Sequence, residues 1–305
     1  MKENISIPDC FYKEEVKEGY SISSKMKHIW AVQLDILWQI IKICEKHNIK
    51  YFAIGGTLLG TVRHKGYIPW DDDLDIAMYR EDYDRFCEIA PKELVEPYFF
   101  QTEATDPGYL LRHAKVRNSR TTGILTVQKE KKYSFNQGIF VDIFPIDKLP
   151  DDLHERELFF EELYKTWGDV YKYSAFLNRQ EQLLSGYLGD FSEDRNTLCE
   201  YSKMKNNSFE ILSGKYKNNS TKDSCIIALT VLPNKINNNW IWQDDDLKDI
   251  EYHFFEFLKI PIPRRYDNIL TKTYGNWREF VIANSLHGDV IFDVEQSYKN
   301  YVNKD

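Results

Sequence analysis

The stretch that decides the fold is residues 51–78, which read YFAIGGTLLGTVRHKGYIPWDDDLDIAM. It begins with a short apolar run, residues 51–54, of the length of a buried strand. Gly55 and Gly56 end this run, and because they lack a side chain they let the backbone turn sharply and approach a ligand closely. A short helix is predicted next, and Pro69 stops any helix before the acidic residues that follow.

Four carboxylates then fall within five positions, at Asp71, Asp72, Asp73 and Asp75. Residues 73–78 alternate polar and apolar side chains, which predicts a half-buried strand with Asp73 and Asp75 on one face. Carboxylates so close together repel one another, and a hard cation such as Mg²⁺, which prefers oxygen ligands, would relieve that repulsion. An acidic run alone is most often solvated surface. Here it follows a glycine turn and a basic cluster and continues into an apolar strand, which favours a functional site.

A further isolated carboxylate, Asp142, lies within the apolar run of residues 138–147, GIFVDIFPID. A carboxylate in such a strand is costly unless it is paired or binds a metal. One interpretation is a third metal carboxylate, on the strand beside that of Asp73 and Asp75. The alternative is a salt bridge or a capping role. Asp147 is expected in the turn before Pro150.

A basic strand is predicted at residues 110–118, with Lys115 and Arg117 on one face and a hydroxyl-rich loop after it. Charged donors beside hydroxyl groups suit phosphate binding. The alternative is a solvated face of a strand.

Several of these motifs resemble the signature of LicD-type phosphotransferases, which have a nucleotidyltransferase fold and are related to the ribitol-phosphate transferases of the fukutin type. The first block comprises GGTLLG, RHKG and IPWDDDLD, between Gly55 and Asp75. The Lys115-x-Arg117 strand, residues 138–145 and the Tyr-Gly-Asn-Trp sequence that begins at Tyr274 are similar to weaker family blocks. The region 151–222 matches no motif of the family.

Pattern and resemblance together predict an α/β (α+β) fold, a nucleotidyltransferase-like mixed sheet core with a helical insertion. Residues 1–150 are expected to form the catalytic core with an N-terminal helix at about 24–47. Residues 151–222 are expected to form the helical insertion, and residues 223–305 to complete the core and the acceptor site. Smaller elements are expected as a helix at 80–90 that stops at Pro91, strands at 98–101 and 225–232, and a helix at 264–274.

The resemblance implies roles for individual residues. Asp73, Asp75 and Asp142 are expected to hold Mg²⁺ or Mn²⁺, and Asp71 is a candidate proton acceptor. Nucleotide and phosphate contacts are expected from Gly55, Gly56, Thr57, Arg63, His64, Lys115 and Arg117. Trp70 and His287 are expected to contact substrate.

The implied reaction is transfer of a phospho-alcohol, with phosphocholine from CDP-choline preferred, to a hydroxyl group of a glycan. Acceptors in this family would be cell-surface glycans or lipid-linked oligosaccharides, including precursors of teichoic acid or lipopolysaccharide. A choline group needs aromatic faces, and Tyr67, Trp70 and Tyr109 lie near the motifs. Two alternatives remain: a nucleotide-sugar glycosyltransferase that uses Asp-x-Asp, and a catalytically inactive glycan-binding module.

Composition excludes other classes of function. The net charge of −8 over 305 residues disfavours sequence-independent nucleic-acid binding. The 5 cysteines are widely spaced without a Cys-x-x-Cys pair, which argues against a zinc site and is typical of reduced thiols. No signal peptide and no apolar run of membrane-spanning length is evident. A cytoplasmic location is therefore expected, and peripheral contact with the inner face of the cell membrane is compatible with it.

Overall fold

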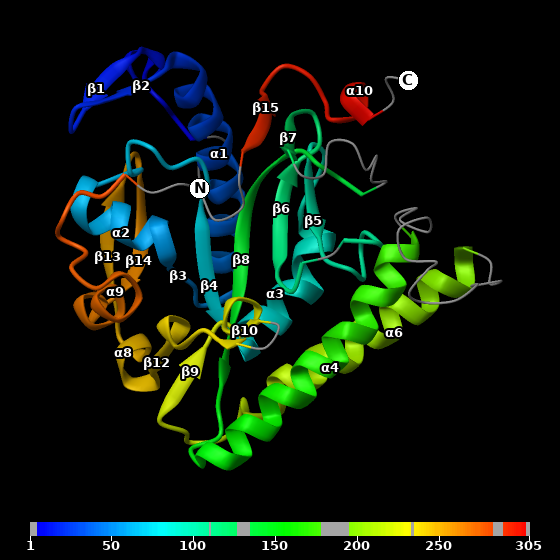
Figure 1. The fold of residues 1–305 in the computed structure, drawn as a ribbon. Coiled ribbons are helices and arrows are strands. Elements are labelled where there is room, and N and C mark those ends of the chain that lie inside the picture. The colour runs from blue at the N-terminus through cyan, green and yellow to red at the C-terminus, as the bar shows by residue number, and fades with distance from the viewer. Residues whose placement is uncertain are drawn as a thin grey trace.

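The computed structural model describes residues 5–109, 111–126, 135–177, 195–232, 235–282 and 289–302. In these residues a seven-stranded mixed sheet has the order β12-β9-β8-β4-β3, with β6 also paired to β8 and β5 to β6 (Figure 1). Helices pack around it, which confirms the predicted α/β (α+β) class. The strands of this sheet are β3 (Phe52–Ala53), β4 (Asp75–Tyr79), β5 (Tyr98–Gln101), β6 (Ala114–Asn118), β8 (Ile139–Lys148), β9 (Asp223–Cys225) and β12 (Ile241–Gln243).

The long strand β8 is the centre of the sheet. It pairs in parallel with β4 and antiparallel with β6 and β9. Every residue from Ile139 to Asp147 is buried. A strand covered on both faces needs an almost continuous apolar run, which is the pattern of residues 139–146.

Helix α1 (Ser24–His47) lies against β8 and β6, and α3 (Arg80–Glu93) lies against β8 and β4. The α1 boundaries agree with the prediction, because the Ser23 side chain accepts a hydrogen bond from the N–H of Met26 and Asn48 adopts a left-handed conformation at the end. Helix α3 continues past Pro91, where a stop was predicted. A proline so near the end of a helix removes few of its hydrogen bonds.

Three predicted strand boundaries were wrong. β4 begins at Asp75, so Asp73 lies in the preceding loop, and β6 begins at Ala114. The run 225–232 contains the end of β9, the short helix α7 (Ile227–Thr230) and β10 (Val231–Leu232). A short apolar run is compatible with a strand or a buried helix, and here Thr230 bonds back to the Ile226 carbonyl through both its N–H and its hydroxyl.

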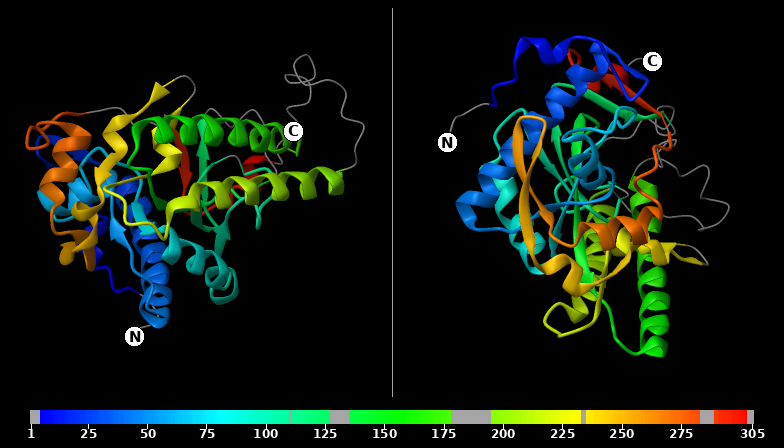
Figure 2. Two further views of the ribbon diagram at one scale, coloured as in Figure 1. Left: turned by 90° about the horizontal axis from the view of Figure 1, so that it is seen from below. Right: turned by 90° about the vertical axis from the view of Figure 1, so that its left-hand side faces the viewer.

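Helices α4 (Leu153–Leu177) and α6 (Arg195–Ser213) occupy part of the region predicted to be a helical insertion. They run side by side away from the sheet, as Figures 1 and 2 show. Arg80 of α3 fastens the pair to the core, because it donates to both carboxylate oxygens of Asp147, at 2.6 and 2.7 Å, and to Glu210 of α6 at 2.5 Å. Asp147 is thus a buried, paired residue of β8, and its placement in a turn was wrong.

The C-terminal third packs beside the glycine turn. The hairpin of β13 (Ile250–Phe255) and β14 (Leu258–Pro263) contacts β3 and α2 (Gly55–His64), and α9 (Tyr266–Tyr274) also contacts α2 (Figure 2). Strand β15 (Val290–Asp293) pairs with β7 (Thr122–Leu125). The remaining elements are η1 (Asp9–Tyr12), β1 (Glu15–Lys17), β2 (Tyr20–Ile22), η3 (Gly214–Tyr216), β11 (Lys235–Ile236), η4 (Asn238–Trp240), α8 (Asp244–Lys248) and α10 (Lys299–Val302).

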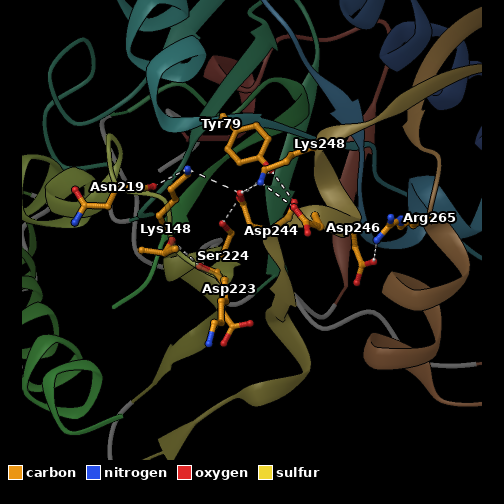
Figure 3. A network of polar contacts seen from close by, with 12 residues as sticks. Tyr79, Lys148, Asn219, Asp223, Ser224, Asp244, Asp246, Lys248 and Arg265 are labelled. Atoms are coloured by element: carbon orange, nitrogen blue, oxygen red, sulfur yellow. Dashed lines mark hydrogen bonds and ion pairs between the residues drawn. The ribbon is translucent and has the colours of Figure 1, made fainter. Parts of the chain in front are cut away.

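A polar network around Asp244 connects this third to the sheet (Figure 3). One oxygen of the buried Asp244 carboxylate accepts from the hydroxyls of Tyr79, at 3.0 Å, and Ser224, at 2.7 Å. The other oxygen lies 3.0 Å from the Lys248 ammonium and 3.8 Å from that of Lys148. The network thus joins β4, β9, β8 and α8.

Among the residues that the structure describes, no helix is both long and apolar enough to cross a membrane.

Candidate active site

Two carboxylates meet on neighbouring strands at the glycine turn. Asp75 opens β4 and lies directly opposite Asp142 of β8 in the parallel register. This confirms the prediction that Asp142 lies on the strand beside Asp75. The N–H of Asp75 donates to the Thr57 hydroxyl at 2.8 Å, which fixes the first turn of α2 against β4.

Gly55 is required where α2 begins. Its φ is +58°, a conformation that L side chains rarely adopt. A Cβ atom there would lie 3.2 Å from Oδ2 of Asp75. Because Gly55 has no side chain, there is open space next to the Asp75 carboxylate.

Asp71, Asp72 and Asp73 form a second group in the loop before β4. Each of these half-buried residues offers an oxygen, and the oxygens lie within 4.8 Å of one another. Helix α1 holds the loop from behind, because the Trp30 indole donates to the Asp71 carbonyl at 3.0 Å and the Gln33 amide donates to the Asp72 carbonyl at 2.7 Å. Asp73 therefore lies with Asp71 and Asp72 in the loop, and the prediction that it shares a strand face with Asp75 was wrong.

Burial and neighbouring carboxylates raise the pKa values of one residue in each group, Asp71 and Asp75. Burial, followed by Asp73 and Asp72, raises the pKa of Asp71 well above its usual range. Burial, followed by Asp73 and Asp142, does the same for Asp75. The region therefore has more negative charge than its own cations balance, which favours a bound cation. An all-oxygen ligand set of this kind suits a hard cation such as Mg²⁺.

Asp142 is already paired within the chain. Lys115 and His113 both contact its Oδ1 atom, the latter through Nε2 at 3.2 Å. Burial alone would raise the pKa of Asp142, but these two partners hold it below its usual range. The salt bridge that the sequence left open as an alternative is thus present.

Lys115 and Arg117 share a face of β6, as predicted, and both lie over the Phe140 ring, at 3.5 and 4.9 Å from its centroid. Each is only 4% exposed, so a solvated strand face is wrong. Arg117 donates to the Gln101 side chain and, at 2.7 Å, to the Gly138 carbonyl. Phosphate binding by this pair stays a prediction, and it concerns side chains that already have partners.

Arg63 binds the C-terminal segment and also contacts His64. Arg63 donates to the carbonyls of Trp277, at 3.0 Å, and Glu279, at 3.1 Å, and to Nε2 of His64 at 2.9 Å. Burial, then Arg63 and Lys17, lowers the pKa of His64 to about 4, so the imidazole is neutral at pH 7.

The aromatic residues expected to face a choline group are placed differently. Tyr67 and Tyr109 are 2% and 1% exposed, so neither presents a ring to a ligand, which corrects that expectation. Trp70 is half-buried, with its ring near Tyr20 and His64. His287 lies outside the described residues.

Two aromatic residues that were not among the predicted site residues lie at the turn instead. The Tyr274 hydroxyl and the Cη2 atom of Trp240 lie 3.8 and 3.9 Å from the position of a Gly55 Cβ. Tyr274 belongs to the Tyr-Gly-Asn-Trp block, which was a signal for it, whereas nothing in the sequence marked Trp240. Asp72, in the acidic run, and His113, within the predicted basic strand at residues 110–118, were given no role at the site.

Gly56 allows a direct test of the position of Asp71. A Cβ at residue 56 would lie 2.5 Å from Oδ2 of Asp71, closer than atoms tolerate. We expect Gly56→Ala to displace this carboxylate and to lower turnover by up to about a hundredfold, the cost of misplacing a group at a reaction centre by about 1 Å. Steady-state rates check this. Gly168→Ala, where a Cβ meets nothing within 4 Å, should leave the rate unchanged, and an equal rate in both variants would show that the Asp71 position is unimportant.

Known proteins are similar to the part of the chain that contains the glycine turn and the carboxylates. Residues 48–176 match the family described as LicD/FKTN/FKRP, nucleotidyltransferase domain. The chain is 39% identical over 122 residues to lipopolysaccharide cholinephosphotransferase LicD of Haemophilus influenzae, over 40% of this chain and 44% of that protein. It is 35% identical over 176 residues to an uncharacterized protein, RP689, of Rickettsia prowazekii, over 55% and 59% of the two chains. A match of 43 residues at 42% identity to human ribitol 5-phosphate transferase FKRP covers 14% and 9% of the chains. The aligned parts thus span less than two thirds of each relative.

Proposed function

Since residues 48–176 match the LicD-family nucleotidyltransferase domain, we propose that the protein is a phosphotransferase acting on cell-surface glycans. It would transfer a phospho-alcohol from a nucleotide-activated donor to a hydroxyl group of the glycan. The single observation that carries this is the convergence of Asp71 and Asp75 on the turn made by Gly55 and Gly56.

The glycine turn suits a phosphate group. The first N–H groups of an α-helix have no partner within the helix and attract anions. Helix α2 has ten residues and no side-chain hydrogen bond at its N-cap, Ile54. The N–H groups of Gly55, Gly56 and Thr57 are therefore expected to hold donor phosphate oxygens.

The carboxylates suit a divalent cation, Mg²⁺ or Mn²⁺, held by the group of Asp71, Asp72 and Asp73. Asp75, paired in register with Asp142, lies at the same turn and is expected to contribute, as the sequence predicts. Such a cation, when bound, neutralises phosphate charge and the charge that develops on the leaving nucleotide. Asp71, which faces Gly56, is a candidate acceptor for the proton of the attacking hydroxyl.

The finer assignment is phosphocholine from CDP-choline, with a glycan or lipid-linked oligosaccharide as acceptor. It rests on the Haemophilus relative, whose name states cholinephosphotransferase activity. The relation to FKRP keeps ribitol phosphate open as the transferred group.

Offering three donors separately tests the reaction. We expect CMP release from one of CDP-choline, CDP-ribitol and CDP-glycerol in the presence of an oligosaccharide acceptor, with the acceptor gaining the mass of the phospho-alcohol. Mass spectrometry of both products checks this. UDP or GDP released from a nucleotide sugar would support the glycosyltransferase instead. Acceptor binding without any turnover would support a glycan-binding module.

A further inference from the structure

The C-terminal third places a hydrogen-bond donor at the carboxylates of the glycine turn. The Tyr274 hydroxyl and the Trp240 indole edge lie within 4 Å of the position of a Gly55 Cβ, as does Oδ2 of Asp75. These three side chains border one space at the start of α2. Tyr274 is 42% exposed as a residue, and Trp240 is half-buried.

Hydrogen bonds from neighbouring residues fix the position of Tyr274. It is the last residue of α9, which ends because Gly275 turns into a positive-φ conformation, +68°. The chain then returns to Trp277, whose indole donates to Asp267 of α9 at 3.1 Å and whose carbonyl accepts from Arg63 of α2. The end of α9 is thereby attached to the helix that begins at the glycine turn.

The residue before Tyr274 connects it to the segment of Trp240. The Thr273 hydroxyl accepts from the Trp242 indole at 3.2 Å and donates to the Asn239 carbonyl at 3.3 Å. Asn239 directly precedes Trp240. These bonds therefore connect the two segments that carry the aromatic side chains, which lie 34 residues apart in the chain.

The chemistry of the surrounding side chains indicates a role for the Tyr274 hydroxyl as a hydrogen-bond donor to phosphate. When a cation is bound, the Asp71 and Asp75 carboxylates are ionised and only accept hydrogen bonds, so they offer no proton to a phosphate oxygen. The basic side chains nearby are engaged, since Lys115 pairs with Asp142 and Arg63 binds two carbonyls. Among the described residues, no hydrogen-bond partner is found for the Tyr274 hydroxyl.

We propose, on the premise of the proposed function, that Tyr274 is a catalytic residue that donates its hydroxyl hydrogen bond to a phosphoryl oxygen of the donor. The bond strengthens as negative charge develops on that oxygen during transfer, so it acts mainly in the transition state. Tyr274 lies downstream of the family match, which ends at residue 176.

The test compares Tyr274→Phe with Tyr266→Phe, a matched change on the same helix whose ring lies near Trp277 and His253. We expect Tyr274→Phe to lower kcat for CMP release by about 100-fold or more, because a donor that acts in the transition state is lost. Its KM for the CDP-activated substrate should change less than about twofold, because a change in KM alone would indicate a loss of ground-state binding. Its melting temperature and its affinity for CMP should equal those of the wild type, and Tyr266→Phe should match the wild type throughout.

Each contrary outcome has a definite meaning. A wild-type kcat in Tyr274→Phe overturns the inference, and so does a loss of kcat that comes with a lower melting temperature and weaker CMP binding, because the hydroxyl would then be structural. If the wild-type protein releases CMP from none of the three CDP-alcohols, the proposed function fails and the inference falls with it. An active wild type with an unaltered Tyr274→Phe variant contradicts the inference alone.

Discussion

Removal of divalent cations with EDTA is expected to abolish CMP release, and Mg²⁺ or Mn²⁺ is expected to restore it. The reason is the charge around the glycine turn, where burial and mutual repulsion raise the pKa values of Asp71 and Asp75. Without a cation, these carboxylates would repel the phosphates of the donor. Rates before and after chelation check this, with circular dichroism to show that the fold persists. Full turnover in metal-free buffer would contradict the metal assignment.

The ligands can be identified by Mn²⁺ affinity rather than by rate. The sequence predicted Asp73, Asp75 and Asp142, whereas the structure gathers Asp71, Asp72 and Asp73. Asp72→Asn should weaken Mn²⁺ binding if the loop group holds the ion. Asp142→Asn should weaken it if the paired strands do.

A control for both variants is Asp9→Asn, at an exposed position in η1 near the N-terminus. Titration of free Mn²⁺ by electron paramagnetic resonance measures each affinity without relying on catalysis. Equal Mn²⁺ affinity in all three variants would show that neither group binds the ion.

The central part of the fold was predictable because its signals are local. Residues 139–146 are apolar enough to predict a strand covered on both faces, and β8 is that strand. The amphipathic pattern of residues 24–47 predicted the extent of α1, although the N-cap is Ser23 and not Ser24, the residue that the sequence suggested. The turn at Gly55 and Gly56 follows from glycine chemistry in the same way.

The place of Asp73 depends on contacts that the sequence does not reveal. Its alternating neighbourhood predicts a strand, but the loop from Asp71 to Asp73 is held by Trp30 and Gln33 of α1, about 40 residues earlier. Such tertiary contacts override the local pattern. The carboxylates therefore form a loop group instead of a row on a strand.

The basic residues show the same limit. Arg63 beside a glycine turn suggests phosphate binding, yet its partners are carbonyls more than 200 residues later. Tyr67 and Tyr109 lie near the motifs in sequence but are buried. The aromatic residues that do lie at the turn, Trp240 and Tyr274, arrive from the far end of the chain.

Asp75→Asn is expected to preserve the fold and to lower turnover at least about a hundredfold, the effect of losing one preorganised electrostatic group. Asn is nearly isosteric with Asp, so the space beside Gly55 stays filled as before. The amide keeps one oxygen but loses the negative charge. The measurement is kcat for CMP release, with Asp9→Asn as the control. Turnover near that of the wild type would show that the Asp75 charge is not needed.

The same variant separates catalysis from stability. The pKa of Asp75 is raised in the folded protein, so in metal-free buffer its ionisation favours the unfolded state. That penalty is absent below the unfolded pKa, about 3.9, and grows as the pH rises toward the folded value. Asp75→Asn should therefore melt at a higher temperature than the wild type at pH 7, and this difference should vanish near pH 4. Thermal unfolding at both pH values checks this. A difference in melting temperature of the same size at pH 4 would mean that the higher stability of Asp75→Asn does not come from removing the charge. If the difference disappears at pH 4 and the variant has lost turnover, the charge of Asp75 destabilises the fold and serves the reaction.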